Sequence, residues 1–258
     1  MSGVVAFLTD PANWSGTTGI PNRLVEHLII SGLSLLFATV IALPLGLYIG
    51  HTNRGSSLAI NLANIGRAVP SYAMMVIMLP LTLSLAPVLG YDPTFGLVFL
   101  PTFLAMAFLA IPPLLVATYA GLRSVDRELI EAGRGMGLRD SQILGRIELP
   151  LASSIIVGGF RTATLQVIAT ATIGAILSGG GLGRFIFDGL AQGAAGYPSI
   201  YAGAVLVAGL AIAVDLVLSL LQTRLTPRAL RKARRRGPSG PTSVIDSPDL
   251  QEQAASPA

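Results

Sequence analysis

The sequence predicts an all-α membrane protein with about five transmembrane helices. Of its 258 residues, 52% are hydrophobic and 12% are charged, and its mean hydropathy is +0.69. Soluble domains carry about 25% charged residues, so this chain has too little polar surface to cover a water-soluble globule of its size. Five stretches also contain the roughly 20 predominantly apolar residues that a spanning helix needs.

The predicted spans are Leu24–Ile49, Leu58–Leu85, Phe95–Leu122, Leu151–Leu177 and Ile200–Leu221. The second contains Pro70 and Pro80, and proline inside a helix removes a hydrogen bond and disturbs the preceding turn. This span is therefore predicted to be kinked, tilted or split in two, and a count of six stays open. Because Pro70 disfavours helix at Val69, a break there would make Ser71 and Tyr72 candidate pathway residues; the alternative is a plain kink.

The basic residues indicate the orientation. Five arginines lie between spans three and four, seven basic residues follow the last span, and Arg54 follows the first. On the other side of the membrane the sequence places only Arg23 and Arg184. Because cytoplasmic loops are rich in Lys and Arg, residues 123–150 and the C-terminus are predicted to be cytoplasmic. With five spans, the N-terminus is then outside.

The predicted organisation has three parts. Residues 1–22 form an extracytoplasmic segment, and residues 23–227 form the transmembrane domain with its loop at 123–150. Residues 228–258 form a tail that is first basic and then disordered, because it is rich in Pro and Ser and poor in large apolar residues. The basic run is interpreted as touching anionic lipid headgroups. Since basic residues cluster beside apolar segments, nucleic acid is not an expected partner.

The loop at 123–150 is too long for an ordinary connection between spans. Its pattern predicts two short helices joined at Gly137, the second ended by Pro150. The apolar residues of the first helix, at near-helical spacing, are Leu129, Ile130, Ala132 and Met136. An amphipathic helix pair of this kind either docks into a groove of another protein or lies on the headgroups.

The loop resembles the EAA loop of the permease subunits of binding-protein-dependent ABC importers. That pattern is E-A-A, three residues, G, nine residues, I, one residue and L-P. The residues in register with it are Glu131, Ala132, Gly137, Ile147, Leu149 and Pro150. Gly133 stands where a second alanine is usual. Because a small residue is retained, we expect a looser local helix with little change in function.

Within that superfamily, the chain is most similar to permeases for glycine betaine, carnitine, choline and related osmoprotectants. This likeness rests on residues 66–75, 159–183 and 215–227. The resemblance implies a MetI-like permease bundle in the cytoplasmic (inner) membrane of a bacterial-type cell, forming the pathway for such a solute. The alternatives are a methionine-type amino-acid importer permease and an ATP-independent channel or secondary transporter. The last would need internal repeats and a coupling-ion site, and the sequence shows neither.

The resemblance also implies partners. Two copies of a cytoplasmic ABC ATPase, a substrate-binding protein outside and a second permease chain, identical or different, would complete the importer. This chain is not expected to be an enzyme or to bind a cofactor or metal, because it has no cysteine, two histidines and no G-x-x-x-x-G-K-[ST] motif. ATP and Mg²⁺ are expected on the partner.

Two charged residues lie deep within predicted spans. Arg161 and Asp215 are each about 10–15 Å from the cytoplasmic surface at 1.5 Å per residue. Since an ion at that depth is costly unless paired or hydrated, the two are predicted to face one another as a structural pair. The alternatives are a direct role in gating or substrate binding, and side chains that snorkel to the interface. The small and hydroxylated residues of span four, among them Thr164 and Thr170, serve close helix packing or line a polar pathway.

Overall fold

The computed structural model describes residues 2–90, 99–178 and 180–225, and each regular element in these ranges is a helix. The elements in chain order are α1 (Ser2–Thr9), η1 (Pro11–Trp14), α2 (Ile20–Thr52), α3 (Ser56–Ala68), α4 (Ser71–Leu89), α6 (Leu100–Arg123), α7 (Arg127–Gly135), α8 (Asp140–Ile143), η2 (Leu144–Glu148), α9 (Leu149–Ser178), α10 (Gly183–Ala191), η3 (Gly193–Gly196) and α11 (Tyr197–Leu225). The all-α prediction is confirmed for these ranges. The predicted tail at 228–258 lies outside them.

Five segments of the described chain are long and apolar enough to cross a membrane, as the sequence predicts. They are Ile20–Thr52, Ser71–Val88, Leu100–Arg123, Asp140–Leu177 and Gly193–Arg224. Their lengths of 18 to 38 residues meet the requirement of about 20 residues for a bilayer core. The protein is therefore a multi-pass membrane protein.

Of the three forms expected for the second predicted span, Leu58–Leu85, the structure shows the split one. The chain leaves the helical conformation at Val69 (ψ 124°) and Pro70 (ψ 132°), which separate α3 from α4. The proline ring excludes helical geometry at the preceding residue, so only the part after the break forms a candidate span. The start of the third predicted span, at Phe95, lies outside the described residues.

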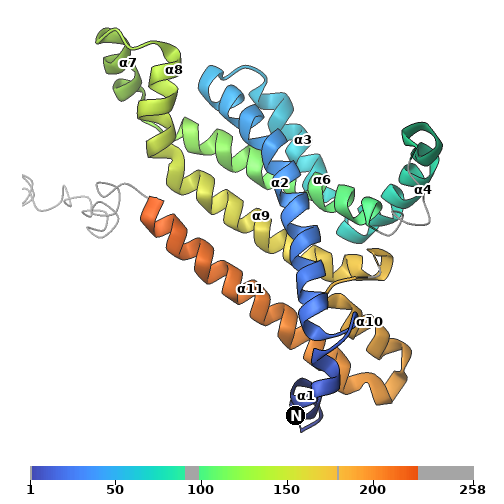
Figure 1. Cartoon of the computed structure of the whole chain (residues 1–258). Helices are drawn as coiled ribbons and strands as arrows, with labels where there is room; N and C mark the ends of the chain where they lie inside the picture. Colours follow the sequence, from blue (N-terminus) through green and yellow to red (C-terminus); the bar gives the residue numbers. More distant parts are fainter. Residues whose placement is uncertain (1, 91–98, 179, 226–258) are drawn as a thin grey trace, which may run out of the picture. The chain divides into compact units, whose positions relative to one another are not determined.

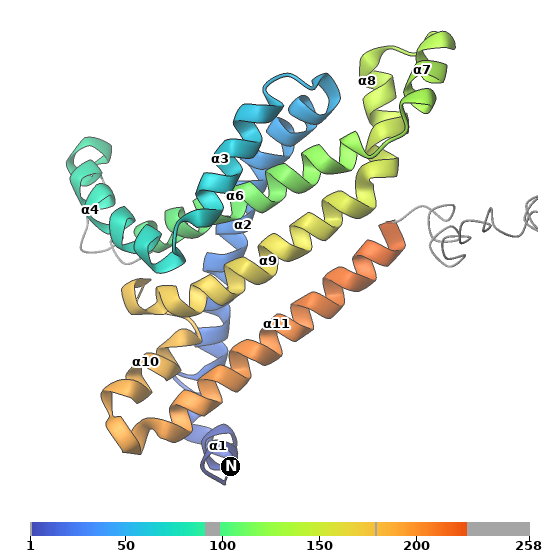
Figure 2. The same ribbon diagram turned by 180° about the vertical axis from the view of Figure 1, so that it is seen from behind.

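Helices α2, α6 and α9 form the centre of the bundle. In the most apolar 18-residue stretch of each candidate span, 61% of the residues are buried in α6 and none in the segment that contains α11. Helix α6 is therefore the central helix and α11 a peripheral one. Figures 1 and 2 show α6, α9 and α11 side by side, with α2 crossing them. The largest core cluster joins α2, α4, α6 and α9 through Ala38, Ala42, Met75, Met106, Ala110 and Ala163, among others.

Glycines allow the central helices to approach closely. A Cβ atom placed on Gly159 of α9 would lie 2.0 Å from the Cβ of Ala117 on α6. One on Gly46 of α2 would lie 2.6 Å from the Cβ of Thr118 on the same central helix. Small residues at such contacts let backbones pack closely in membranes, where the hydrophobic effect does not drive helices together.

The two ends of the bundle carry different elements. Figure 1 shows α7 and α8 at the end where α2 leads into α3, with α1 and α10 at the opposite end. There, Phe7 of α1 packs edge-to-face on Phe185 of α10 at 5.7 Å between ring centroids. Leu8 and Leu206 pack against the same cluster, which attaches the N-terminal helix to α10 and α11.

Candidate functional site

Helix α7 is a short helix with defined caps at both ends. The side chain of Asp126 accepts a hydrogen bond from the Glu128 N–H at 3.0 Å, satisfying a free donor of the first turn. At the other end Gly137 has a φ of +82°, a left-handed conformation that glycine adopts without strain. The N–H of Leu138 then bonds to the carbonyl of Gly133, a Schellman closure. The predicted junction at Gly137 is therefore present.

The second helix of the loop does not end at Pro150, so that prediction is wrong. It begins at Asp140 and continues through the π-helical segment η2 into α9. In η2 the Leu149 N–H bonds to the carbonyl of Leu144, five residues back. Proline has no backbone N–H to donate, and its ring clashes with the preceding turn of a regular α-helix. We attribute the tolerance of Pro150 to the wider π turn, which gives the ring more room. The loop thus extends the fourth span as one helical segment.

An apolar cluster fixes α7 to the bundle. Ile130 of α7 packs into the group formed by Leu122, Val125 and Ala152. The other members are Leu47, Leu144, Ile147, Leu151 and Ile156. Helices α2, α6, α7 and α9 and segment η2 therefore meet at one point.

Gly133 is buried at this contact. A Cβ atom there would lie 2.8 Å from the terminal Cδ1 of Ile147, the flexible end of a side chain. An alanine would therefore require only that this methyl group move. The packing of Ile147 over position 133 is compatible with glycine and, after this small shift, with the usual alanine.

Much of the remaining surface of α7 is exposed. Glu131 and Ala132 are open to solvent, and the large apolar side chains of Leu129 and Met136 are 48% and 75% exposed. Within the described chain, Glu131 has no hydrogen bond or ion pair. Helix α7 therefore presents exposed apolar side chains and, on a different side of the helix, an unpaired carboxylate, both accessible to a protein partner.

The remaining residues of the pattern divide between the two faces. Gly137, Leu149 and Pro150 are exposed. Ile147 is half-buried in η2, where the loop joins α9. Across the turn, Arg134 and Asp140 form an exposed ion pair at 3.3 Å. Exposed pairs of this kind contribute at most about 1 kcal/mol to stability.

The structure brings Arg161 and Asp215 together between α9 and α11. The Nε and Nη2 atoms of Arg161 each donate to one oxygen of Asp215, both at 2.5 Å. This two-bond geometry is the strong form of the arginine–carboxylate interaction. Further along the same helix pair, Gln222 donates to the carbonyl of Ser154 at 2.9 Å. Polar contacts therefore hold the peripheral helix α11 against α9.

The four candidate pathway residues lie on two helices. Ser71 and Tyr72 open α4, and Tyr72 is half-exposed. Thr164 and Thr170 are buried on α9, and Thr164 donates to the carbonyl of Phe160 in its own helix. In the described ranges, no hydrogen bond joins any two of the four.

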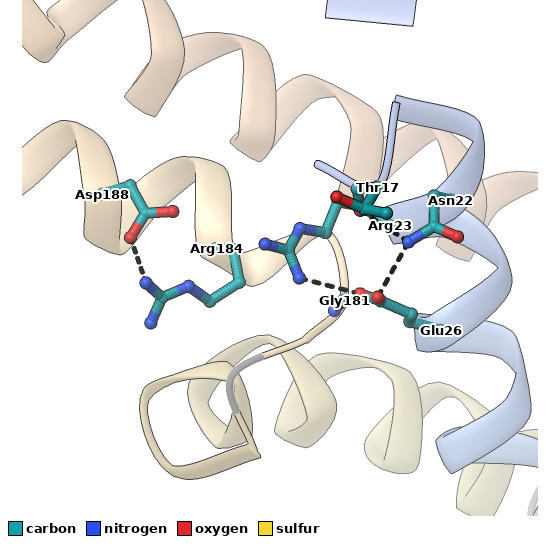
Figure 3. A network of polar contacts seen from close by, with 7 residues as sticks. All are labelled: Thr17, Asn22, Arg23, Glu26, Gly181, Arg184 and Asp188. Atoms are coloured by element: carbon teal, nitrogen blue, oxygen red, sulfur yellow. Dashed lines mark hydrogen bonds and ion pairs between the residues drawn. The ribbon is translucent and has the colours of Figure 1, made fainter. Parts of the chain in front are cut away.

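The polar contacts of two glutamates are among those that the sequence did not predict. At the loop end of the bundle, His51 of α2 meets the buried Glu148 of η2, with 2.5 Å between Nδ1 and Oε2. At the opposite end, Glu26 accepts from the Gly181 N–H at 2.8 Å and from Arg23 at 2.9 Å (Figure 3). Each glutamate is a lone acid at the edge of an apolar stretch, which is the signal that could have identified it.

The network in Figure 3 ties the start of α2 to the turn before α10. Asn22 donates to the second oxygen of Glu26 at 2.9 Å and to the carbonyl of Thr17 at 2.6 Å. Arg184 and Asp188 form an ion pair within α10 beside it. These contacts order the end of the bundle opposite to α7.

The fold and the site define a helical multi-pass membrane component with a short exposed helix, α7, at one end of its bundle. Two solved structures of the MetNI methionine ABC transporter, in inward-facing conformations, have chains of this fold, with TM-scores of 0.69 and 0.68. Sequence identities are 21% and 22%; the matches cover 81% and 85% of this chain and 96% and 100% of those chains. The predicted MetI-like bundle is thus confirmed.

The chain belongs to the family "Binding-protein-dependent transport system inner membrane component", whose model matches residues 42–231. It is 34% identical to the choline transport system permease protein OpuBB of Bacillus subtilis, over 82% of this chain and 91% of that protein. It is 32% identical to the osmoprotectant import permease protein OsmW of Salmonella typhimurium, over 80% of this chain and 91% of that protein. The resemblance noted in the sequence is confirmed.

Proposed function

We propose that this permease forms the membrane pathway for a quaternary ammonium osmoprotectant, of the kind represented by glycine betaine, choline or carnitine. A substrate-binding protein delivers the solute on the side of α1 and α10, and a separate ABC ATPase drives transport from the side of α7. The solute class is supported by relatives whose names specify choline or osmoprotectant transport. The methionine-type alternative is supported less, because that likeness is one of fold at 22% identity.

The observation that carries the proposal is the exposed face of α7 on a continuous helical support. Glu131 and Met136 offer a charge and an apolar side chain to a groove on the ATPase. When the ATPase closes on ATP, it displaces α7. The contact of Ile130 with the apolar cluster around Leu122 and Ala152, and the continuity of α8, η2 and α9, transmit this displacement to the fourth span.

The proposed orientation follows the charge distribution. Residues 1–22 lie outside, the loop at 123–150 and the segment after Leu225 lie in the cytoplasm, and the basic residues at 228–236 contact anionic lipid. Two ATPase subunits hold the ATP and Mg²⁺, and this chain has no catalytic role. A second permease chain, identical or different, completes the pathway.

Replacing Glu131 with alanine is expected to lower substrate-stimulated ATP hydrolysis by about tenfold, because a charged contact to the ATPase is lost. The measurement is ATPase activity of the reconstituted complex with binding protein loaded with glycine betaine, choline, carnitine or methionine. Stimulation by a quaternary ammonium compound supports the solute class, and stimulation by methionine alone contradicts it. Solute flux without any ATPase would contradict the importer mechanism itself.

The turn at Gly137 provides a matched pair of variants. Gly137→Val is expected to reduce the same stimulated activity, because a β-branched residue at φ +82° costs roughly 1–2 kcal/mol and shifts the turn. Gly137→Asn is the control, since asparagine tolerates the left-handed conformation, and it should retain most of the activity. Equal activity of the two variants would show that the turn geometry does not position α7.

A further inference from the structure

His51 and Glu148 join two elements that are 97 residues apart in the sequence. His51 lies in the last turn of α2, and Glu148 is the final residue of η2. Their side chains are 16% and 4% exposed, and the Nδ1–Oε2 distance is 2.5 Å. The two atoms are within hydrogen-bond distance, and the tautomer of the imidazole ring decides which of them donates.

Apolar residues close to the pair in sequence are closely packed. Leu47 and Ile49 of α2 pack within core clusters, and Leu151 of α9 lies in the same cluster as Leu47. A Cβ atom on Gly50 would lie 2.9 Å from the Cβ of Leu122. His51 is the one polar partner of the Glu148 side chain among the described residues, so loss of either partner leaves a buried group unsatisfied.

Glu148 lies in the segment that connects the loop helices to α9, so its pairing with His51 links α2 to that segment. Segment η2 lies between α8 and α9, and single-turn π segments mark places where a helix deviates from its regular hydrogen bonding. Continuity of the chain connects α7 and α8 with α9. The His51–Glu148 pair adds a polar connection from the same segment to α2, beside the apolar contact of Leu47 with the cluster around Leu122 and Ala152.

We infer that His51 and Glu148 are positioning residues that make α2 move with α9 when the ATPase displaces α7. This inference rests on the proposed importer function. Without the pair, α2 follows the displacement only through its apolar contacts with η2 and α9. ATP hydrolysis then continues while less solute is carried for each ATP consumed.

The test uses the complete reconstituted complex and measures solute taken up per ATP hydrolysed. His51→Leu leaves the buried carboxylate unpaired and is expected to lower stability. The double variant His51→Leu/Glu148→Met removes both polar groups with similar shapes, which restores stability toward the original level. We expect this double variant to hydrolyse ATP normally and to transport about fivefold less solute per ATP.

The conservative variant His51→Gln retains an N–H donor and is expected to recover part of the transport ratio. A purely structural role predicts that the double variant recovers both stability and the transport ratio, which would overturn the inference. An absence of ATP-dependent uptake by the unmodified complex would instead contradict the proposed function. The two failures are therefore distinguishable.

Discussion

Gly159→Ala is expected to lower the free energy of unfolding by roughly 1–3 kcal/mol, the usual cost of overpacking a close contact. The added Cβ would lie 2.0 Å from the Cβ of Ala117 and 3.4 Å from the carbonyl oxygen of Pro113. Neither atom belongs to a flexible side chain, so α6 and α9 must separate to accommodate the methyl group. Because α6 is the central helix, the separation disturbs the whole bundle.

The measurement is reversible unfolding of the purified protein in mixed micelles, with the fraction of folded protein followed by circular dichroism. Gly209→Ala on α11 is the matched control, since no atom lies within 4 Å of its added Cβ. It should be neutral or stabilising by up to about 1 kcal/mol through helix propensity. The double variant Gly159→Ala/Ala117→Gly moves the methyl group across the contact and should recover much of the loss. Equal stability of the two single variants would contradict the close contact.

The features predicted correctly from the sequence are those encoded locally. A span is a run of apolar residues long enough for the bilayer, so five spans could be counted without tertiary information. The break at Val69 follows from the ring of the next residue. The turn at Gly137 was placed by its spacing between two periodic segments, and the structure shows the left-handed conformation that glycine permits.

The errors and omissions depend on contacts distant in sequence or on unusual helix geometry. Pro150 was expected to stop a helix because an ordinary α-helix does not accommodate it, and the π turn preceding it changes that geometry. The pairing of His51 with Glu148 requires the crossing of α2 past the loop, which no local pattern encodes. Arg161 and Asp215 were matched because deep charges in a membrane have few ways to be satisfied.

Removing either partner of the Arg161–Asp215 pair is expected to reduce the yield of folded protein by about tenfold. Arg161→Ala leaves a carboxylate, and Asp215→Ala leaves a guanidinium, within a membrane span and without the two hydrogen bonds at 2.5 Å. The measurement is the amount of monodisperse protein recovered in detergent, with Thr162→Ala as a control at an exposed position near Arg161. Yields equal to the control would show that the pair does not hold α11 in place.

Two double variants distinguish a structural pair from a gate. Arg161→Asp/Asp215→Arg keeps opposite charges on α9 and α11, and a structural pair predicts that it recovers part of the yield. Arg161→Met/Asp215→Leu removes both charges, and since an apolar replacement of an ion pair is often neutral for stability, it should also fold. If either recovered protein assembles with the ATPase and transports solute, the pair serves to hold the two helices together. If both fold but neither transports, the charges themselves act in the transport cycle, because helix packing has then been restored without restoring function.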